Sequence, residues 1–182
     1  LGDVYKRQLI NRSVCFNMLN NYNDAIKDCE KIIKLDPKLA PAYNNLGWAY
    51  LIKGNNEKAI IKYKKAIELQ PNYIDAINNL GGAYFNLGDK KMAAEYFKKS
   101  LEIDPKNTET FRSLILNKGI DVNDRIIKKF YELYDENEKE LENCNQKSIP
   151  KNILENHSSL CFALGFLNDN EKSYKEAYKY LE

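Results

Sequence analysis

A period of 34 residues runs through the first 107 positions of this 182-residue chain and limits the folds that it can adopt. Pro37, Pro71 and Pro105 keep that spacing, and they end the similar phrases "IIKLDP", "AIELQP" and "SLEIDP". Further positions keep the same step: Ala25, Ala59 and Ala93; Phe16, Tyr50 and Tyr84; Gly47 and Gly81; Gly54 and Gly88. Such self-similarity indicates stacked units, each of which needs a neighbour to bury its apolar face.

The pattern inside each period is L-G-x-x-Y, a turn glycine, an alanine, an aromatic residue, then alanine and proline, and it resembles the tetratricopeptide repeat. The resemblance covers residues 9–107 as three repeats, which span about 6–39, 40–73 and 74–107. The first repeat departs most, because Arg12 and Ser13 replace Leu-Gly and Asn20 replaces the turn glycine. In the third repeat Ser100 replaces an alanine. The resemblance implies an all-α fold, a right-handed superhelix of antiparallel helix pairs.

The residue types of the pattern have a physical basis. Small residues such as Gly47 and Ala59 let two helix axes approach closely. Gly54 and Gly88 suit the left-handed residue that ends a first helix, and Asn20 can substitute there. A proline after the second helix prevents its continuation.

The stretch "AYNNLGWAYLIKG" (residues 42–54) raises a question, because asparagine is a mediocre helix former. On a helical wheel Ala42, Leu46 and Ala49 form the packing face. Asn44 and Asn45 fall on a different stripe, together with Trp48. The family resemblance implies that first helices line the concave side, so this stripe is expected to face the groove.

Asn11, Asn45 and Asn79 share one repeat position, so stacking predicts a row of amides along the groove. An amide carries donors and an acceptor and can pair with the main chain of an extended peptide. The row resembles the asparagine ladder of O-GlcNAc transferases. An alternative is compositional drift in a chain rich in Asn, Lys, Ile and Tyr. The candidate peptide-binding residues are Asn11, Asn44, Asn45, Trp48, Asn78, Asn79 and Phe85.

A second family reading is disfavoured. "NRS" at residues 11–13 and "DCEKIIKLDP" resemble co-chaperones that clamp the terminal carboxylate of Hsp70 or Hsp90. That clamp needs Lys and Arg on the first helix of the following repeat. The matching positions hold Pro41 and Asn45, so a carboxylate has little to bind.

After Pro105 the pattern decays into a divergent helical region, residues 108–150, followed by a truncated repeat-like helix pair, residues 151–182. The phrase from Phe162 to Gly165, with Tyr174 and Tyr178 at the expected spacing, resembles the end of the repeat region that precedes the catalytic domain of bacterial sulfotransferases. This resemblance implies an alternative function, the non-catalytic N-terminal part of a sulfotransferase whose catalytic domain lies downstream. A third possibility is an oligomerisation scaffold.

Composition narrows the function classes. The net charge is only +2 and no basic stripe is present, which argues against a nucleic-acid-binding protein. The apolar runs are too short to form a helix that spans a membrane. His157 is the single histidine, and the four cysteines form no CxxC pair, so no catalytic residue, metal or cofactor is expected. Reduced thiols and the missing leader predict a cytoplasmic protein.

The first eight residues, "LGDVYKRQ", resemble a translated sequencing adapter, because GAT-GTG-TAT-AAG-AGA-CAG encodes Asp3 to Gln8. We therefore expect residues 1–8 to be an artefact and give them no functional role. The alternative is that they are the natural start of the first helix.

Overall fold

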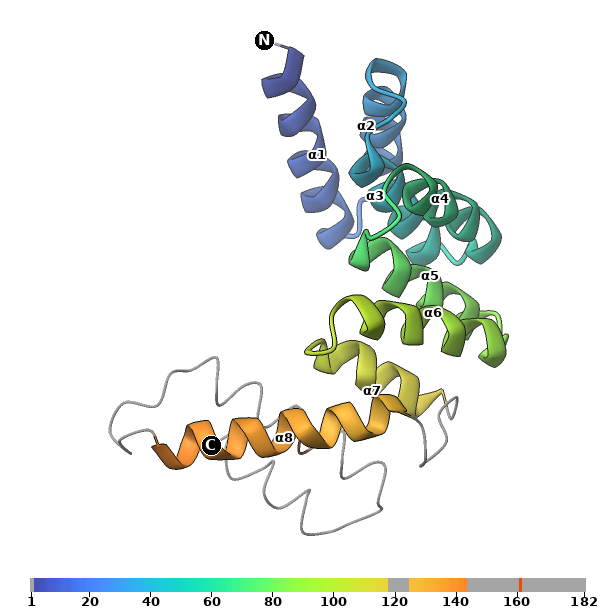
Figure 1. Cartoon of the computed structure of the whole chain (residues 1–182). Coiled ribbons are helices and arrows are strands. Elements are labelled where there is room, and N and C mark those ends of the chain that lie inside the picture. Colours follow the sequence, from blue (N-terminus) through green and yellow to red (C-terminus); the bar gives the residue numbers. More distant parts are fainter. Residues whose placement is uncertain (1, 118–124, 144–160, 162–182) are drawn as a thin grey trace. The chain divides into compact units, whose positions relative to one another are not determined.

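The computed structural model describes residues 2–117, 125–143 and 161, and within them it contains eight α-helices and no strand (Figure 1). The helices are α1 (Gly2–Met18), α2 (Tyr22–Leu35), α3 (Ala40–Ile52), α4 (Asn56–Leu69), α5 (Ile74–Asn86), α6 (Lys90–Ile103), α7 (Thr108–Leu116) and α8 (Arg125–Asn143). The all-α prediction is confirmed. The chain divides into two compact units, residues 1–96 and 97–182.

In the first unit consecutive helices pack as antiparallel neighbours, and α3 is the most enclosed of them. It contacts α2 and α4, and it also contacts the first helices α1 and α5 of the adjoining repeats. From Ala40 to Ala49 every residue of α3 is buried except Pro41 and Trp48, which are half-buried. Burial on nearly all sides means that this helix has packing contacts well beyond the single face drawn on the helical wheel.

The turns between paired helices repeat the same geometry. Asn20, Gly54 and Gly88 adopt positive φ angles of 60°, 78° and 79°, as predicted for this position. The residue after each turn residue donates its backbone N–H to a carbonyl five residues earlier, with N–O distances between 2.8 and 3.0 Å. These bonds satisfy carbonyls that the helix leaves unpaired, which is why the turn recurs with the period.

The second helices end where the prolines predict. α2, α4 and α6 finish at Leu35, Leu69 and Ile103, each two residues before a proline. The intervening Asp36 and Gln70 have φ angles of −147° and −140°, outside the helical region. This agrees with the steric restriction that proline places on the residue before it.

Residues 2–8 form the first two turns of α1. Lys6 pairs with Asp36, the residue that follows α2, at 3.0 Å and with Asp3 at 2.9 Å. The ammonium group of Lys31 lies 5.2 Å from the ring centroid of Tyr5. These contacts place the segment against α2. The origin of residues 1–8 as an adapter artefact stays a prediction.

Candidate functional site

The seven predicted binding residues lie on the three first helices of residues 1–96. Asn11 lies on α1; Asn44, Asn45 and Trp48 lie on α3; Asn78, Asn79 and Phe85 lie on α5. Their exposure differs sharply. Asn11 and Phe85 are exposed, Trp48, Asn78 and Asn79 are half-buried, and Asn44 and Asn45 are each only 7% exposed.

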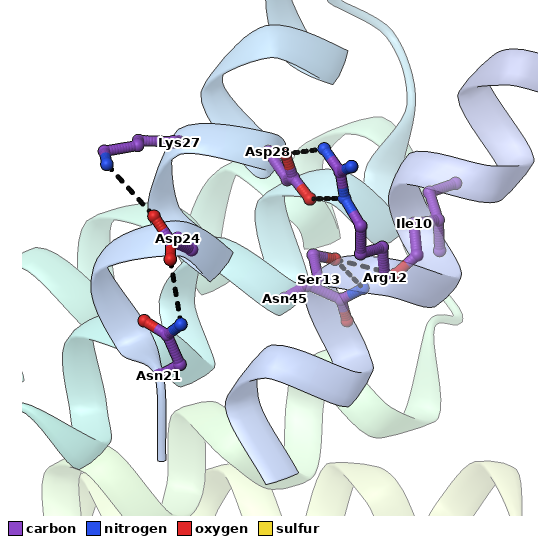
Figure 2. Close-up of polar contacts among 8 residues, drawn as sticks. All are labelled: Ile10, Arg12, Ser13, Asn21, Asp24, Lys27, Asp28 and Asn45. Atoms are coloured by element: carbon purple, nitrogen blue, oxygen red, sulfur yellow. Dashed lines mark hydrogen bonds and ion pairs between the residues drawn. The ribbon is translucent and has the colours of Figure 1, made fainter. Parts of the chain in front are cut away.

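Asn45 forms its hydrogen bonds with the preceding repeat. Its side-chain nitrogen donates to the hydroxyl of Ser13 on α1 at 3.4 Å (Figure 2). Its backbone carbonyl accepts a hydrogen bond from the amide of Asn17 at 3.2 Å. Asn45 was expected on an open stripe, whereas the structure buries it between α1 and α3.

The next repeat boundary is bridged by a second amide contact. The side-chain nitrogen of Asn79 on α5 donates to the side-chain oxygen of Asn44 on α3 at 3.0 Å. The bond joins the second repeat to the third. Asn79 is half-buried and Asn44 is buried. In both pairs amide groups connect one repeat to the next, and a role of the amide row in peptide binding stays a prediction.

Two further amide oxygens on these helices lack a hydrogen-bond partner among the described residues. They belong to Asn17, which is 3% exposed, and to Asn78. A buried acceptor without a donor is destabilising by about 1–3 kcal/mol, so leaving these two oxygens unpaired opposes folding. Sequence reasoning missed Asn17, because it stands where the later repeats have Leu51 and Phe85.

Apolar side chains at the ends of the same helices reach solvent. Phe85 on α5 is 43% exposed, Ile52 on α3 is 47% exposed and Met18 on α1 is 70% exposed. Met18 and Ile52 share one repeat position, and Phe85 stands one residue before its equivalent. Together with the half-buried Trp48, they give the first helices apolar contact area beside the amides.

An ion pair joins α1 to α2 at the positions where the first repeat departs from the pattern. The guanidinium of Arg12 makes two parallel hydrogen bonds with the carboxylate of Asp28, at 2.6 and 2.7 Å (Figure 2). The hydrogen bonds to Asp28 raise the pKa of Arg12. Bidentate geometry of this kind fixes the relative orientation of two groups.

Beside this pair, Cys29 is fully buried on α2, and burial raises the pKa of its thiol to about 11. Cys15 is exposed and Cys161 is buried. The part of the chain that the structure describes contains no group of three or more His, Cys, Asp or Glu side chains able to hold a metal ion. Among the described helices, none is long and apolar enough to cross a membrane.

Several predicted features lie outside the described residues. They are Cys144, His157 and the phrase of residues 162–178 on which the sulfotransferase resemblance depends. That resemblance stays a prediction.

Four family models match the chain, and all of them describe tetratricopeptide repeats. They cover residues 10–39, 29–61, 47–88 and 74–107. Together they span residues 10–107, and this part of the chain consists of tetratricopeptide repeats.

Solved structures agree with this assignment. MamA is 28% identical, with 75% of this chain and 81% of MamA covered at a TM-score of 0.63. The Sgt2 TPR domain of Aspergillus fumigatus is 25% identical. The match covers 63% of this chain and 77% of that domain, at a TM-score of 0.60. The second TPR domain of human RPAP3, solved in complex with the HSP70 peptide SGPTIEEVD, is 25% identical. The match covers 65% of this chain and 98% of that domain, at a TM-score of 0.60.

Among curated proteins, heat shock protein STI1 of Saccharomyces cerevisiae is 41% identical over 49 residues. That match covers 27% of this chain and 8% of the length of STI1.

Proposed function

We propose that this chain is a protein-interaction module that binds an extended peptide along the first helices α1, α3 and α5. The observation that carries the proposal is the match to the second TPR domain of human RPAP3, of which 98% is covered and which was solved with a peptide bound. The exposed Phe85, the half-buried Trp48 and the partly exposed Asn79 supply aromatic and amide contacts on these helices. Aromatic side chains of this kind commonly dominate the binding energy of an interface.

The peptide is held by its main chain and apolar side chains rather than by a terminal carboxylate. The positions of the two clamp cations carry Pro41 and Asn45 on α3, and neither side chain is charged. Arg12 lies on α1 but is already engaged by Asp28. Without available cations at these positions a carboxylate gains no charge-assisted hydrogen bonds there.

The amides have divided roles in this proposal. Asn44 and Asn45, both buried, hold adjacent repeats together through their contacts with Asn79 and Ser13. Asn11 and Asn79 keep exposed area and are the members of the predicted row that reach a peptide.

The test begins with selection of binding peptides from a random library displayed on phage, with the 182-residue chain as bait. Phe85→Ala is expected to weaken binding of the selected peptide by about tenfold or more, as for an aromatic hot spot. Ile61→Ala is the control, because Ile61 is an exposed apolar residue, 60% exposed against 43% for Phe85, and lies on the second helix α4. Equal losses in both variants, or no selected binder, would overturn the proposal.

A second arm tests how the peptide is recognised. The selected peptide is synthesised with a free and with an amidated C-terminus, and both forms are titrated by fluorescence anisotropy. Equal affinity supports main-chain recognition, and loss of binding on amidation would contradict it. Circular dichroism of each variant shows whether the helices remain intact.

A further inference from the structure

The second unit contains a cavity of about 360 Å³, separate from the helices α1, α3 and α5 of the proposed peptide site. Its apolar lining includes Leu101 of α6 and Phe111 of α7, both buried. The volume falls within the range of about 300–1,000 Å³ that is typical of ligand sites. The cavity is large enough to enclose one large apolar side chain.

The rim of this cavity is predominantly cationic. Lys98 of α6 and two residues of α8, Arg125 and Lys129, line it, against a single carboxylate, that of Glu102. Arg125 and Lys129 stand one helical turn apart and are both exposed. Neither has an ion-pair partner among the described residues.

We propose that this cavity binds an acidic peptide segment, in which one large apolar residue enters the cavity and flanking carboxylates pair with Arg125 and Lys129. Charge complementarity selects the occupant, because the cations come from two different helices and surround an apolar floor. A ligand with one terminal carboxylate, such as a fatty acid, can pair with only one of the two cations, Arg125 or Lys129. The proposal goes beyond the peptide site of α1, α3 and α5 and does not depend on it.

The probe is the fluorescein-labelled peptide Ac-Glu-Glu-Leu-Glu-Glu-amide, titrated with the 182-residue chain by fluorescence anisotropy. Saturable binding is expected, and replacement of every Glu by Gln or of the Leu by Asn is expected to abolish it. Binding of the Gln peptide as tight as that of the parent would overturn the role of charge. Absence of saturable binding by the parent peptide would overturn the proposal.

Variants locate the binding on the chain. Arg125→Gln combined with Lys129→Gln is expected to raise Kd about tenfold, or ~1.4 kcal/mol. Lys128→Gln removes one positive charge from the same helix, where the double variant removes two. Lys128 does not line the cavity, and this variant is expected to change Kd less than about twofold. Glu102→Gln is expected to lower Kd, because it removes a like charge from the rim.

Three outcomes would contradict this assignment. The first is equal weakening by Lys128→Gln and the double variant, which would indicate general attraction to a basic surface. The second is weaker binding by Glu102→Gln. The third is weakening by Phe85→Ala to the same extent as by the double variant, which would place the probe on α1, α3 and α5 instead. Phe85→Ala also keeps the two proposals distinguishable, because failure at one site leaves the other measurable.

Discussion

The first and second repeats each pack two antiparallel helices together, but with different side chains at the contact. At four matched positions the first repeat has Arg12, Ser13, Asp28 and Cys29, and the second has Leu46, Gly47, Lys62 and Tyr63. The first repeat therefore joins its two helices with a bidentate ion pair and small side chains. The second joins them with a buried leucine and an aromatic ring laid against a glycine.

The pairs at the second and fourth of these positions are complementary in size. A Cβ atom on Gly47 would lie 2.7 Å from Cε1 of Tyr63, closer than real Cβ atoms come to neighbouring atoms. In the first repeat the residue opposite is Cys29, which is small enough for Ser13 to be accommodated. The Ser13 hydroxyl donates to the carbonyl of Ile10 at 2.7 Å and accepts the Asn45 amide. A departure from the repeat pattern is therefore compensated within the same helix pair.

The largest effect is expected for Gly47→Ala. The added methyl group clashes with the buried ring of Tyr63, and overpacking of this kind costs about 1–3 kcal/mol. Gly82→Ala on α5 is the control, because its added Cβ meets nothing within 4 Å, and it is expected to stabilise the fold by up to ~1 kcal/mol. Urea denaturation followed by circular dichroism measures both. Equal stabilities of the two variants would show that Tyr63 moves aside without cost.

Next in size is Arg12→Gln, which leaves the carboxylate of Asp28 buried without its cation. Breaking a fully buried pair is strongly destabilising, but the side chain of Arg12 is 55% exposed, so we expect a smaller loss of stability than for a buried pair. The same denaturation experiment applies.

The control for Arg12→Gln transplants the second repeat into the first, as Arg12→Leu with Asp28→Lys. Since apolar replacement of a buried pair is often neutral, this double variant is expected to be more stable than Arg12→Gln. A double variant as unstable as the single one would show that the ion pair has no substitute at this site.

A smaller effect is expected at alkaline pH from Cys29. Because burial raises the pKa of this thiol to about 11, the folded state keeps the proton after the unfolded chain has lost it. Its contribution is fully present below the ordinary thiol pKa and is lost as pH rises toward 11. Near pH 10 the loss amounts to ~1 kcal/mol. The free energy of unfolding is measured between pH 8 and about 10.5, and Cys29→Ala, which lacks the thiol, is expected to lose less over the same interval.

The smallest effect, with the opposite sign, is expected for Tyr63→Phe. The hydroxyl of Tyr63 is buried and has no hydrogen-bond partner in the described part of the chain, and burial raises its pKa. Removing an unpartnered hydroxyl is expected to stabilise the fold by ~1 kcal/mol. The third repeat already has Phe97 at this position. A loss of stability in thermal denaturation would show that the hydroxyl has a partner in solution.

Much of the local structure was predictable from the sequence. The turn residues Asn20, Gly54 and Gly88 have the predicted left-handed backbone, because only a few residue types adopt it at low cost. The helix ends before the prolines follow from sterics in the same way. These features depend on residues close in the chain, and a single sequence specifies them directly.

The candidate site was predictable only in part. The sequence identified Asn44, Asn45 and Asn79 as residues of one recurring position and its neighbour, and the structure places them on α3 and α5. It did not indicate that Asn45 turns to Ser13 or Asn79 to Asn44. A helical wheel assigns one packing face, whereas α3 is packed against helices on several sides. The orientation of these amides depends on that surrounding packing.

The period, the helix pairs and their turns could be read from the amino-acid sequence, because each follows from backbone restrictions and apolar spacing within one repeat. Which polar groups pair across repeats, and which apolar side chains such as Phe85 stay exposed, depends on the packing of the folded chain. The physical reason is that burial and hydrogen bonding at a repeat boundary involve side chains about 30 residues apart. Those contacts form between stacked units, and no single repeat contains both partners.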